Sequence, residues 1–478
     1  MSSKIFSRRY LFFGVACLGL LMTTIDLSIV AVAIPSLRRS FDTSLGWVGL
    51  TLTANQLTQV IAMPLAGKFS DYFGRKRVFV LCTACFTFGS LLCALAPNIA
   101  LLIIFRIVQA IGAGGLMPSA TGIVAVEFKE QRDKAIGLFV TVGAIGAMIG
   151  PIMGGWLLEY WTWRAIFFVN VPIGAVVLIG AFLFIKEQRV AQVRHQIDYA
   201  GLALFAAAMV ALMSAVTVAG NPNELRSPLL WTLVTASMVL FALFVRQEKR
   251  CRQPIMDMRL VSRSPFLQTN SYNFIMGISI LGSSALIPYF AVVQYHVGAI
   301  QSGAVAIPRA FAVVVISILT SFLFVRLGYR IPMMVGMLLL AFGTLLASFG
   351  WMHLSLGPIA VDGLWILAIS MAISGIGMGF AQPAANNAMI DLMPDQAAAI
   401  AGLRGMFRWT GGIMAISVEV LALSWFSDQA AGARTVYFVQ GLVLLLAVPM
   451  ALMIPDTIRQ RVKRVVLAAS THQTGQEA

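Results

Sequence analysis

Long apolar runs alternate with short polar segments along almost the whole chain of 478 residues. Fourteen of these runs have about the length, roughly 20 residues, that crosses the hydrocarbon core of a bilayer as a helix. The pattern therefore predicts an all-α integral membrane protein with fourteen spans. The expected spans cover residues 11–34, 47–67, 78–96, 99–126, 135–158, 165–185, 199–219, 229–245, 268–293, 303–325, 331–351, 361–390, 399–424 and 434–454.

Positive charge is distributed unequally between the two sides of these spans. Charged residues make up only 11% of the chain, whereas soluble domains carry about 25%. Of the 34 Lys and Arg behind the net charge of +15, 25 lie in loops on the side of the N-terminus. This asymmetry follows the positive-inside rule, so both termini are expected in the cytoplasm. Membrane topology thus explains the positive charge, and no nucleic-acid partner is expected. The other basic residues are Arg38, Arg39, Arg164, Arg226 and Arg434 on the opposite side, and Arg106, Arg309, Arg404 and Arg408 within spans.

Cysteine and histidine give no sign of a metal or redox centre, and we expect no metal and no cofactor. Cys82 and Cys85 form a Cys-x-x-Cys pair, but both fall inside an expected span with no second pair and no histidine nearby. Small core residues are the better interpretation. The start of the chain could be read as a cleaved signal peptide, but its apolar run is too long, and we interpret it as a retained first span.

The two ends of the chain repeat each other at an offset of 265 residues (110 to 375). The string Ala110-Ile111-Gly112-Ala113-Gly114 returns as Gly375-Ile376-Gly377-Met378-Gly379, and Gly146 returns as Gly411. Parallel six-span repeats predict two helical bundles around a central path, with a substrate site near the bilayer midplane. We expect a six-span bundle in 1–190, two inserted central spans and a basic linker in 191–262, a second six-span bundle in 263–456, and a cytoplasmic tail in 457–478.

A charged segment, Gly67-Lys68-Phe69-Ser70-Asp71-Tyr72-Phe73-Gly74-Arg75-Lys76-Arg77, separates the second and third spans. Two glycines allow the chain to reverse sharply there, and an ordinary basic loop would also explain the segment. Its pattern Gly-x-x-x-Asp-x-x-Gly-Arg-Lys resembles the loop between spans 2 and 3 of the major facilitator superfamily. The resemblance implies a loop that gates the cytoplasmic side through Gly67, Asp71, Gly74, Arg75 and Lys76.

Two ionisable residues lie within the apolar spans of the first repeat. Asp26 is in the middle of span 1, where a charge is costly unless it faces a cavity or a partner. Arg106 lies in span 4 and needs acceptors or water because arginine stays charged. Both surrounding patterns resemble drug:proton antiporters, in which the Asp is the proton-linked residue and the Arg assists it. A polar contact between helices for Asp26 and a structural ion pair for Arg106 are the alternatives.

Span 5 carries glycines at every fourth position. Small residues at this spacing allow close helix packing, while Pro151 removes one helical hydrogen bond and bends the span. The whole string Gly146-x-x-x-Gly150-Pro151-x-x-Gly154-Gly155 resembles the antiporter signature of exporters, which indicates efflux rather than uptake. The strings Trp161-Thr162-Trp163-Arg164, Asp198-x-x-Gly201 and Arg408-Trp409-Thr410-Gly411-Gly412 are similar to the fourteen-span drug:proton antiporter branch.

Span 13 places Arg404, Arg408, Gly412 and Glu419 on one face at helical spacing. One hypothesis is that this face lines the transport path, with the arginines meeting an acidic group on substrate or protein and Glu419 acting as a second titratable site. The alternative is that Arg404 and Glu419 reach opposite membrane surfaces. Other polar residues within spans would line the path or form interhelical hydrogen bonds, namely Asn55, Gln59, Arg309, Gln382 and Asn386.

The resemblance implies a proton-coupled secondary transporter rather than an enzyme, exporting hydrophobic drugs or toxic compounds across the cytoplasmic (inner) membrane by alternating access. The partners would be a small-molecule substrate, protons and the lipid bilayer, with a periplasmic adaptor and outer-membrane channel by family analogy only. No Gly-x-x-x-x-Gly-Lys-Ser/Thr nucleotide loop is present in the sequence. The alternatives are an exporter of one metabolite, antibiotic or siderophore, a proton symporter for uptake, and a membrane-embedded enzyme or sensor.

Overall fold

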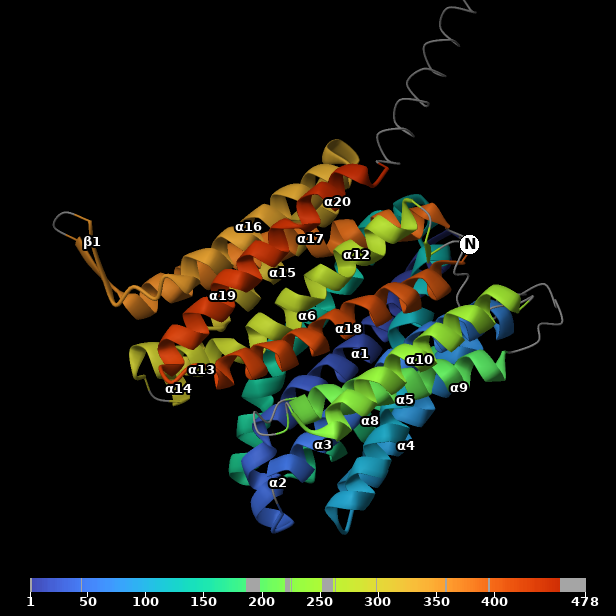
Figure 1. The fold of residues 1–478 in the computed structure, drawn as a ribbon. Helices are drawn as coiled ribbons and strands as arrows, with labels where there is room; N and C mark the ends of the chain where they lie inside the picture. Colours follow the sequence, from blue (N-terminus) through green and yellow to red (C-terminus); the bar gives the residue numbers. More distant parts are fainter. Residues whose placement is uncertain are drawn as a thin grey trace, which may run out of the picture.

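The computed structural model describes residues 2–455, apart from 44, 186–197, 220–223, 225, 252–260, 263, 298, 357–358 and 394–395. Nearly all of the described chain is helical (Figure 1). The expected tail at 457–478 and most of the linker in 191–262 lie outside the described residues. The helices of the first repeat are α1 (Ser2–Val32), α2 (Ile34–Ser40), α3 (Leu45–Phe73), α4 (Arg75–Ala94), α5 (Ile99–Glu127), α6 (Arg132–Tyr160), α7 (Ala165–Phe168) and α8 (Asn170–Phe184), with a short 3₁₀ turn at Lys129–Gln131.

Two helices, α9 (Tyr199–Ala219) and α10 (Pro228–Arg250), pack on each other between the repeats. The second repeat begins with a helix that a π-helical turn divides, η3 (Ile278–Ser283) between α12 (Phe266–Gly277) and α13 (Ser284–Tyr295). The remaining helices are α14 (Ala299–Ala304), α15 (Ile307–Leu327), α16 (Arg330–Ser348), α17 (Gly363–Leu392), α18 (Ala397–Ser424), α19 (Gln429–Leu445) and α20 (Ala447–Met453).

Ten helical stretches in the described part are long and apolar enough to cross a membrane. The other four expected spans, 47–67, 199–219, 268–293 and 399–424, are also helical, in α3, α9, α12 to α13 and α18. Large apolar side chains such as Phe182, Phe241 and Phe342 are exposed on the outside of the helices, as a lipid-facing surface requires.

Within the otherwise helical fold, the described residues include one small pair of strands. Two short antiparallel strands, β1 (His353–Leu356) and β2 (Ile359–Asp362), pair from His353 with Asp362 to Leu356 with Ile359. They connect α16 to α17 and project from one end of the helical body (Figure 1).

The packing of the first repeat recurs in the second. In the first repeat α5 packs on α3 and α4, and α1 packs on α6; in the second, α17 packs on α15 and α16, and α12 packs on α18. The contacts between the repeats are also paired, because α3 packs on α18 and α6 packs on α15. The same helices of each repeat therefore meet the partner repeat.

The repeated glycines explain the closest helix pairs. A Cβ on Gly112 of α5 would lie 2.9 Å from the Cα of Phe86 on α4, and a Cβ on Gly377 of α17 would lie 2.9 Å from the Cα of Leu340 on α16. Real Cβ atoms essentially never approach this closely, so glycine is what permits these backbones to touch. The sequence repeat therefore reflects equivalent close contacts in the two halves.

Candidate functional site

Asp26 lies near the C-terminal end of α1, and it is almost completely buried, with 2% of its surface exposed. Its carboxylate accepts three hydrogen bonds. Arg106 Nη1 donates to Oδ2 at 2.7 Å, while Gln109 Nε2 and Asn170 Nδ2 donate to Oδ1 at 2.9 and 2.8 Å. The site thus joins α1, α5 and α8 around one buried ion pair.

Arg106 and Gln109 are three residues apart on α5, so both side chains lie on the same face of the helix. Gln109 accepts a 2.6 Å hydrogen bond from Arg106 Nη1 and donates a 2.7 Å hydrogen bond to the hydroxyl of Ser90 on α4. The guanidinium of Arg106 also lies 5.6 Å from the centre of the Phe167 ring. Gln109 therefore fixes the geometry of both members of the ion pair.

The glycines of α6 position the other face of α1. A Cβ on Gly146 would lie 3.2 Å from the carbonyl oxygen of Leu21, and one on Gly150 would lie 3.1 Å from that of Ile25. Gly154 is equally close to Ile29, whereas nothing lies within 4 Å of a Cβ on Gly155. This close packing holds α1 so that Asp26 points away from α6 and toward Arg106. Pro151 lies in α6, but its side chain is outside the described part.

The polar residues of α3 form one hydrogen bond to α5 and one within α3. Asn55 Nδ2 donates to the carbonyl oxygen of Arg106 at 3.3 Å, and Gln59 Nε2 donates to Asn55 Oδ1 at 2.7 Å. Both side chains are buried. In this conformation they support the backbone that carries Arg106.

The expected gating loop is more helical than its glycines suggested, and the prediction of a sharp turn at Gly67 was wrong. Gly67 lies inside α3, where a Cβ would come within 2.9 Å of the Cα of Ala399 on α18. The turn is confined to Gly74, whose φ of +105° favours glycine. Gly67 is therefore needed for a close approach between the two repeats.

Charged contacts join the two repeats around the C-terminal end of α3. Asp71 Oδ2 accepts a 2.9 Å hydrogen bond from the backbone N–H of Ala399 in the first turn of α18, while its Oδ1 pairs with Arg75 at 3.0 Å. Arg75 also donates to the carbonyl oxygen of Gly122 at 3.0 Å. Lys76 instead contacts α8 through the carbonyl oxygen of Phe182 at 3.3 Å.

Residues near the C-terminal end of α17, in the second repeat, form similar contacts with the start of α6 in the first repeat. Asp391 of α17 forms an ion pair with Arg132 of α6, and Asn387 Nδ2 donates to the carbonyl oxygen of Asp133 at 2.9 Å. Tyr329 donates to the second oxygen of Asp391 at 3.0 Å. Together with Asp71, these contacts tie both repeats together at the end of the molecule where α6 and α18 begin.

Arg408 and Arg309 bind neutral groups. Arg408 Nη2 donates to the side-chain oxygens of Asn273 on α12 and Asn386 on α17, at 2.8 Å each. Arg309 Nη2 donates to the carbonyl oxygen of Ser279 at 2.9 Å, within the π-helical turn. Such a turn changes the usual carbonyl pairing and occurs frequently at functional sites. Gln382, which was expected on the path, is half-buried.

Glu419 is buried, with 6% of its surface exposed, so the alternative in which it reaches the membrane surface was wrong. Its Oε1 accepts a 2.9 Å hydrogen bond from Gln440 Nε2 on α19. Gln440 also accepts a 2.9 Å hydrogen bond from Ser283 at the end of the π-helical turn. Glu419 therefore belongs to a second buried polar cluster, formed by α18, α19 and η3.

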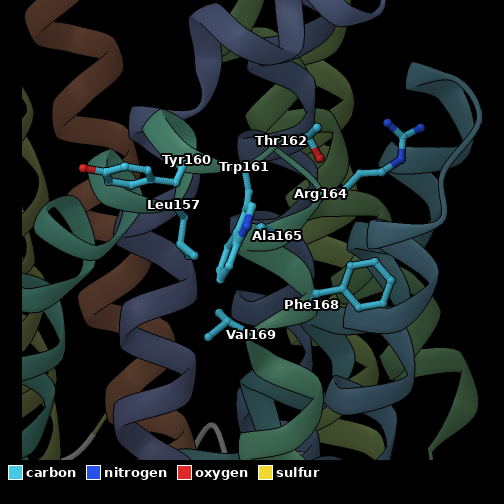
Figure 2. A pocket seen from close by; sticks show the side chains of 8 residues that line it. All are labelled: Leu157, Tyr160, Trp161, Thr162, Arg164, Ala165, Phe168 and Val169. Carbon is cyan, nitrogen blue, oxygen red and sulfur yellow. The ribbon is translucent and has the colours of Figure 1, made fainter.

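A cavity of about 660 Å³ opens at the C-terminal end of α6, beside α7. Figure 2 shows Trp161 lying among Leu157, Ala165 and Val169, with the guanidinium of Arg164 directed away from them. Trp161, Thr162 and Arg164 of its lining belong to the string that resembled the fourteen-span branch. It contains none of the predicted site residues and is distinct from the Asp26 cluster.

Gln109, Asn170, Asn273 and Gln440 were not predicted as site residues. Each lies in an apolar helix, where an uncharged amide has to find a partner. The spacing of Arg106 and Gln109 was a usable signal, because side chains three residues apart share a face. The other three come from helices distant in sequence, so only the fold shows which charge each of them contacts.

Comparison with known proteins gives one family over almost the whole chain. The family profile of the Major Facilitator Superfamily matches residues 16–250 and 271–470. The Multidrug resistance protein B homolog of Mycobacterium tuberculosis is 31% identical over 419 residues, which are 86% of this chain and 76% of that protein. The Multidrug transporter protein MdtP of Bacillus subtilis is 29% identical over 86% of this chain and 75% of its own length.

The Riboflavin transporter RibZ of Clostridioides difficile is 28% identical over 80% of this chain and 81% of that protein. Among solved structures, the human organic anion transporter MFSD10 (TETRAN) superposes with a TM-score of 0.69 at 16% identity, covering 93% of this chain and 99% of that one. The proton:xylose symporter XylE gives a TM-score of 0.65 at 14% identity, with coverages of 94% and 97%. At these identities the two structures show the fold alone.

Proposed function

Because the chain belongs to the major facilitator superfamily, we propose that it exports hydrophobic drugs or other toxic compounds across the cytoplasmic membrane in exchange for protons. The names of the multidrug relatives support this proposal, since each is similar over 86% of the chain. The buried Asp26 cluster supports the proton-coupled mechanism. In this role the protein is a transporter and catalyses no covalent chemistry.

The proposed architecture has fourteen spans with both termini in the cytoplasm. Two six-span bundles, within 1–190 and 263–456, would move relative to each other, with α9 and α10 as an insert between them and a cytoplasmic tail in 457–478. The paired contacts of α3 with α18 and α6 with α15 support two related halves. The bias of Lys and Arg toward one side supports the orientation.

Coupling of substrate export to proton entry would depend on whether Asp26 is protonated. While its carboxylate is ionised, the bond to Arg106 Nη1 balances both charges in a site with almost no exposed surface. Protonation from outside removes one charge, so the same contact loses its ionic part and Arg106 is left without its counter-charge. The free-energy difference between the two conformations of the carrier would then depend on whether Asp26 is protonated or ionised. Coupling requires such a dependence.

Gating would depend on the ties between the repeats. The contacts of Asp71 with Ala399 and of Asp391 with Arg132 close the end on which the basic segments lie, which is the cytoplasmic end in this proposal. Breaking them would open the path inward for substrate. Glu419 would serve as a second proton site, since one of its oxygens has no hydrogen-bond donor among the described residues.

An exporter dedicated to one metabolite is the second candidate. It is favoured by the relative named as a riboflavin transporter, which is similar over 80% of this chain. A periplasmic adaptor and an outer-membrane channel would extend the export route in a host with two membranes.

The decisive experiment compares efflux by cells producing wild type, Asp26→Asn or Glu159→Gln, with and without a protonophore. Glu159 is an exposed acid near the end of α6, so Glu159→Gln is a matched control for loss of one carboxylate. We expect wild type and Glu159→Gln to extrude dye until the protonophore is added, and Asp26→Asn to fail throughout. Undiminished, protonophore-insensitive efflux by Asp26→Asn would refute proton coupling through this residue.

A further inference from the structure

The face of α18 that carries Arg404 and Arg408 holds two buried positive charges. Arg404 is 1% exposed and Arg408 is 7% exposed, so the alternative in which Arg404 reaches the membrane surface was wrong. Nε, Nη1 and Nη2 of Arg404 all lack a hydrogen-bond partner in the described part of the chain. A guanidinium without an acceptor and away from water is unfavourable by several kcal/mol, which makes this position unusual.

The second arginine, Arg408, has partners, but none of those among the described residues is a counter-charge. Both acceptors of Arg408 are neutral amide oxygens, from Asn273 and Asn386, and its Nε has no partner among the residues that the structure describes. The nitrogen of the Asn386 amide is also unpaired there. Arg404, Arg408 and Asn386 therefore present donors that another molecule could use.

Asn270 extends the cluster by one helical turn. It lies three residues before Asn273 on α12, as Arg404 lies four residues before Arg408 on α18. The two helices run in the same direction, because Phe274 lies beside Gly411 and Gly282 lies beside Glu419. Arg404 and Asn270 are thus placed one turn nearer to the same end of the two helices. Asn270 is 1% exposed, and within the described ranges both atoms of its amide lack a partner.

The buried carboxylates of the described helices are bound elsewhere. Glu419 is 11 residues beyond Arg408 on α18 (408 to 419), which corresponds to about 16 Å along the helix. Asp26 is bound to Arg106, Asp71 to Arg75 and Asp391 to Arg132, while Glu248 of α10 lies beside Gly201 of α9. No acid of the described chain is therefore shown to neutralise Arg404 or Arg408.

The cluster lies close to the boundary between the repeats. Asn387, the neighbour of Asn386, donates its hydrogen bond to the carbonyl oxygen of Asp133 on α6 of the first repeat. Arg404 is only five residues beyond Ala399 (399 to 404), whose N–H holds Asp71 at the closed end. A compound that entered when these contacts open would meet Arg404 first and Arg408 one turn later.

From this arrangement we infer that Arg404 and Arg408, with Asn270 and Asn386, bind an anionic group of the transported compound. The inference rests on the proposed export function and specifies its substrate class as amphipathic organic acids with a carboxylate. A guanidinium donates two parallel hydrogen bonds to a carboxylate, and charged hydrogen bonds in a water-poor site are the strong ones. The apolar body of the compound would lie among the surrounding apolar side chains.

The test measures binding of two fluorescent dyes to the purified full chain by anisotropy. The dyes share one xanthene ring system, and one carries a free carboxylate where the other carries its methyl ester. We expect wild type to bind the acid at least about tenfold more tightly, and Arg404→Gln or Arg408→Gln to weaken acid binding by about 10- to 100-fold while leaving ester binding within twofold. Arg250→Gln, at the exposed end of α10, should bind both dyes as wild type does.

Arg404→Lys keeps the charge but loses the planar pair of donors, so its affinity for the acid should lie between wild type and Arg404→Gln. If Arg404→Gln does not fold, Arg404→Lys and Arg408→Gln give the same comparison. Equal binding of acid and ester by wild type overturns the inference, as does unchanged acid binding by the folded Gln variants. Displacement of the acid by excess anionic phospholipid would identify a lipid site and would also overturn it.

Transport in proteoliposomes separates this inference from the proposed function. Arginine-dependent binding of the acid without proton-driven movement of either dye would contradict the export proposal and leave the anion site intact. Proton-driven export of both dyes that is insensitive to both arginine substitutions would support export and contradict the anion site.

Discussion

The buried pair of Asp26 and Arg106 gives the sharpest stability prediction. Replacing Arg106 with Met removes the 2.7 Å contact but keeps the length of the side chain. Breaking a buried pair from one side costs about 3–5 kcal/mol, because the remaining charge is left without compensation. The two amide donors, Gln109 and Asn170, still reach Asp26 Oδ1, so we expect about 3 kcal/mol, near the lower end of this range.

The double variant Asp26→Asn/Arg106→Met removes both charges and should be more stable than the sum of the two single losses predicts. Unfolding entropy of about 2.1 cal/mol/K per residue amounts to about 1 kcal/mol/K for a chain of 478 residues. A loss of about 3 kcal/mol therefore lowers Tm by about 3 °C, and the double variant should recover most of that.

The assay is the thermal unfolding midpoint of the four purified proteins in one detergent, followed by tryptophan fluorescence. Asp26→Asn combined with Glu159→Gln serves as a control cycle between residues without a described contact, and its effects should add. Additive losses in the Asp26–Arg106 cycle would refute the reasoning, because they would mean that neither charge depends on the other.

Three further predictions concern packing, gating and the second acid. Gly112→Val should abolish most folded protein in size-exclusion chromatography, because any Cβ there meets α4, whereas Gly155→Ala has no neighbour within 4 Å and should fold normally. Asp71→Asn weakens a charge-assisted hydrogen bond to Ala399 worth about 1.5–3 kcal/mol, so inverted vesicles should show roughly tenfold slower dye uptake; wild-type uptake would contradict a gating role. Glu419→Gln should keep dye binding but reduce the number of protons exchanged per dye in proteoliposomes, and an unchanged ratio would exclude it as a second proton site.

The apolar pattern predicted the helices well because a membrane leaves few alternatives for the backbone. Helices satisfy their own hydrogen bonds, so the long apolar runs at 78–96 and 331–351 correspond to α4 and α16. The position at which a π-helical turn interrupts a helix was not predictable from that pattern. The π-helical turn at Ile278–Ser283 contacts Glu419 and Gln440, which come from distant parts of the chain.

The candidate site was predictable only in part, for a similar reason. An ionised Asp26 in an apolar span had to find a partner, and Arg106 in another span was an available base. The sequence alone did not show that Gln109 and Asn170 complete the carboxylate's hydrogen bonds. Gly67 was misread because glycine serves both for turns and for close contacts, and only the position of Ala399 distinguishes these two uses.

The two repeats share one scaffold but distribute their charges differently. Close contacts pair Leu21 of α1 with Gly146 and Phe274 of α12 with Gly411, so the position equivalent to Asp26 is Ser279 (21 to 274, 26 to 279). At the offset of 265, Arg106 corresponds to Met371. The second repeat therefore lacks the ion pair at this place.

In the second repeat the buried bases lie instead on α15 and α18, where Arg309 and Arg408 bind neutral oxygens. A balanced pair responds to one proton, because protonation changes its charge from zero to positive. Bases without a counter-charge respond instead to the arrival of an anion. This difference supports assigning proton exchange to Asp26 in the first repeat and substrate binding to Arg404 and Arg408 in the second. Because α5, which carries Arg106, packs on α18, which carries Arg404 and Arg408, a change of charge in either cluster would alter the same interface.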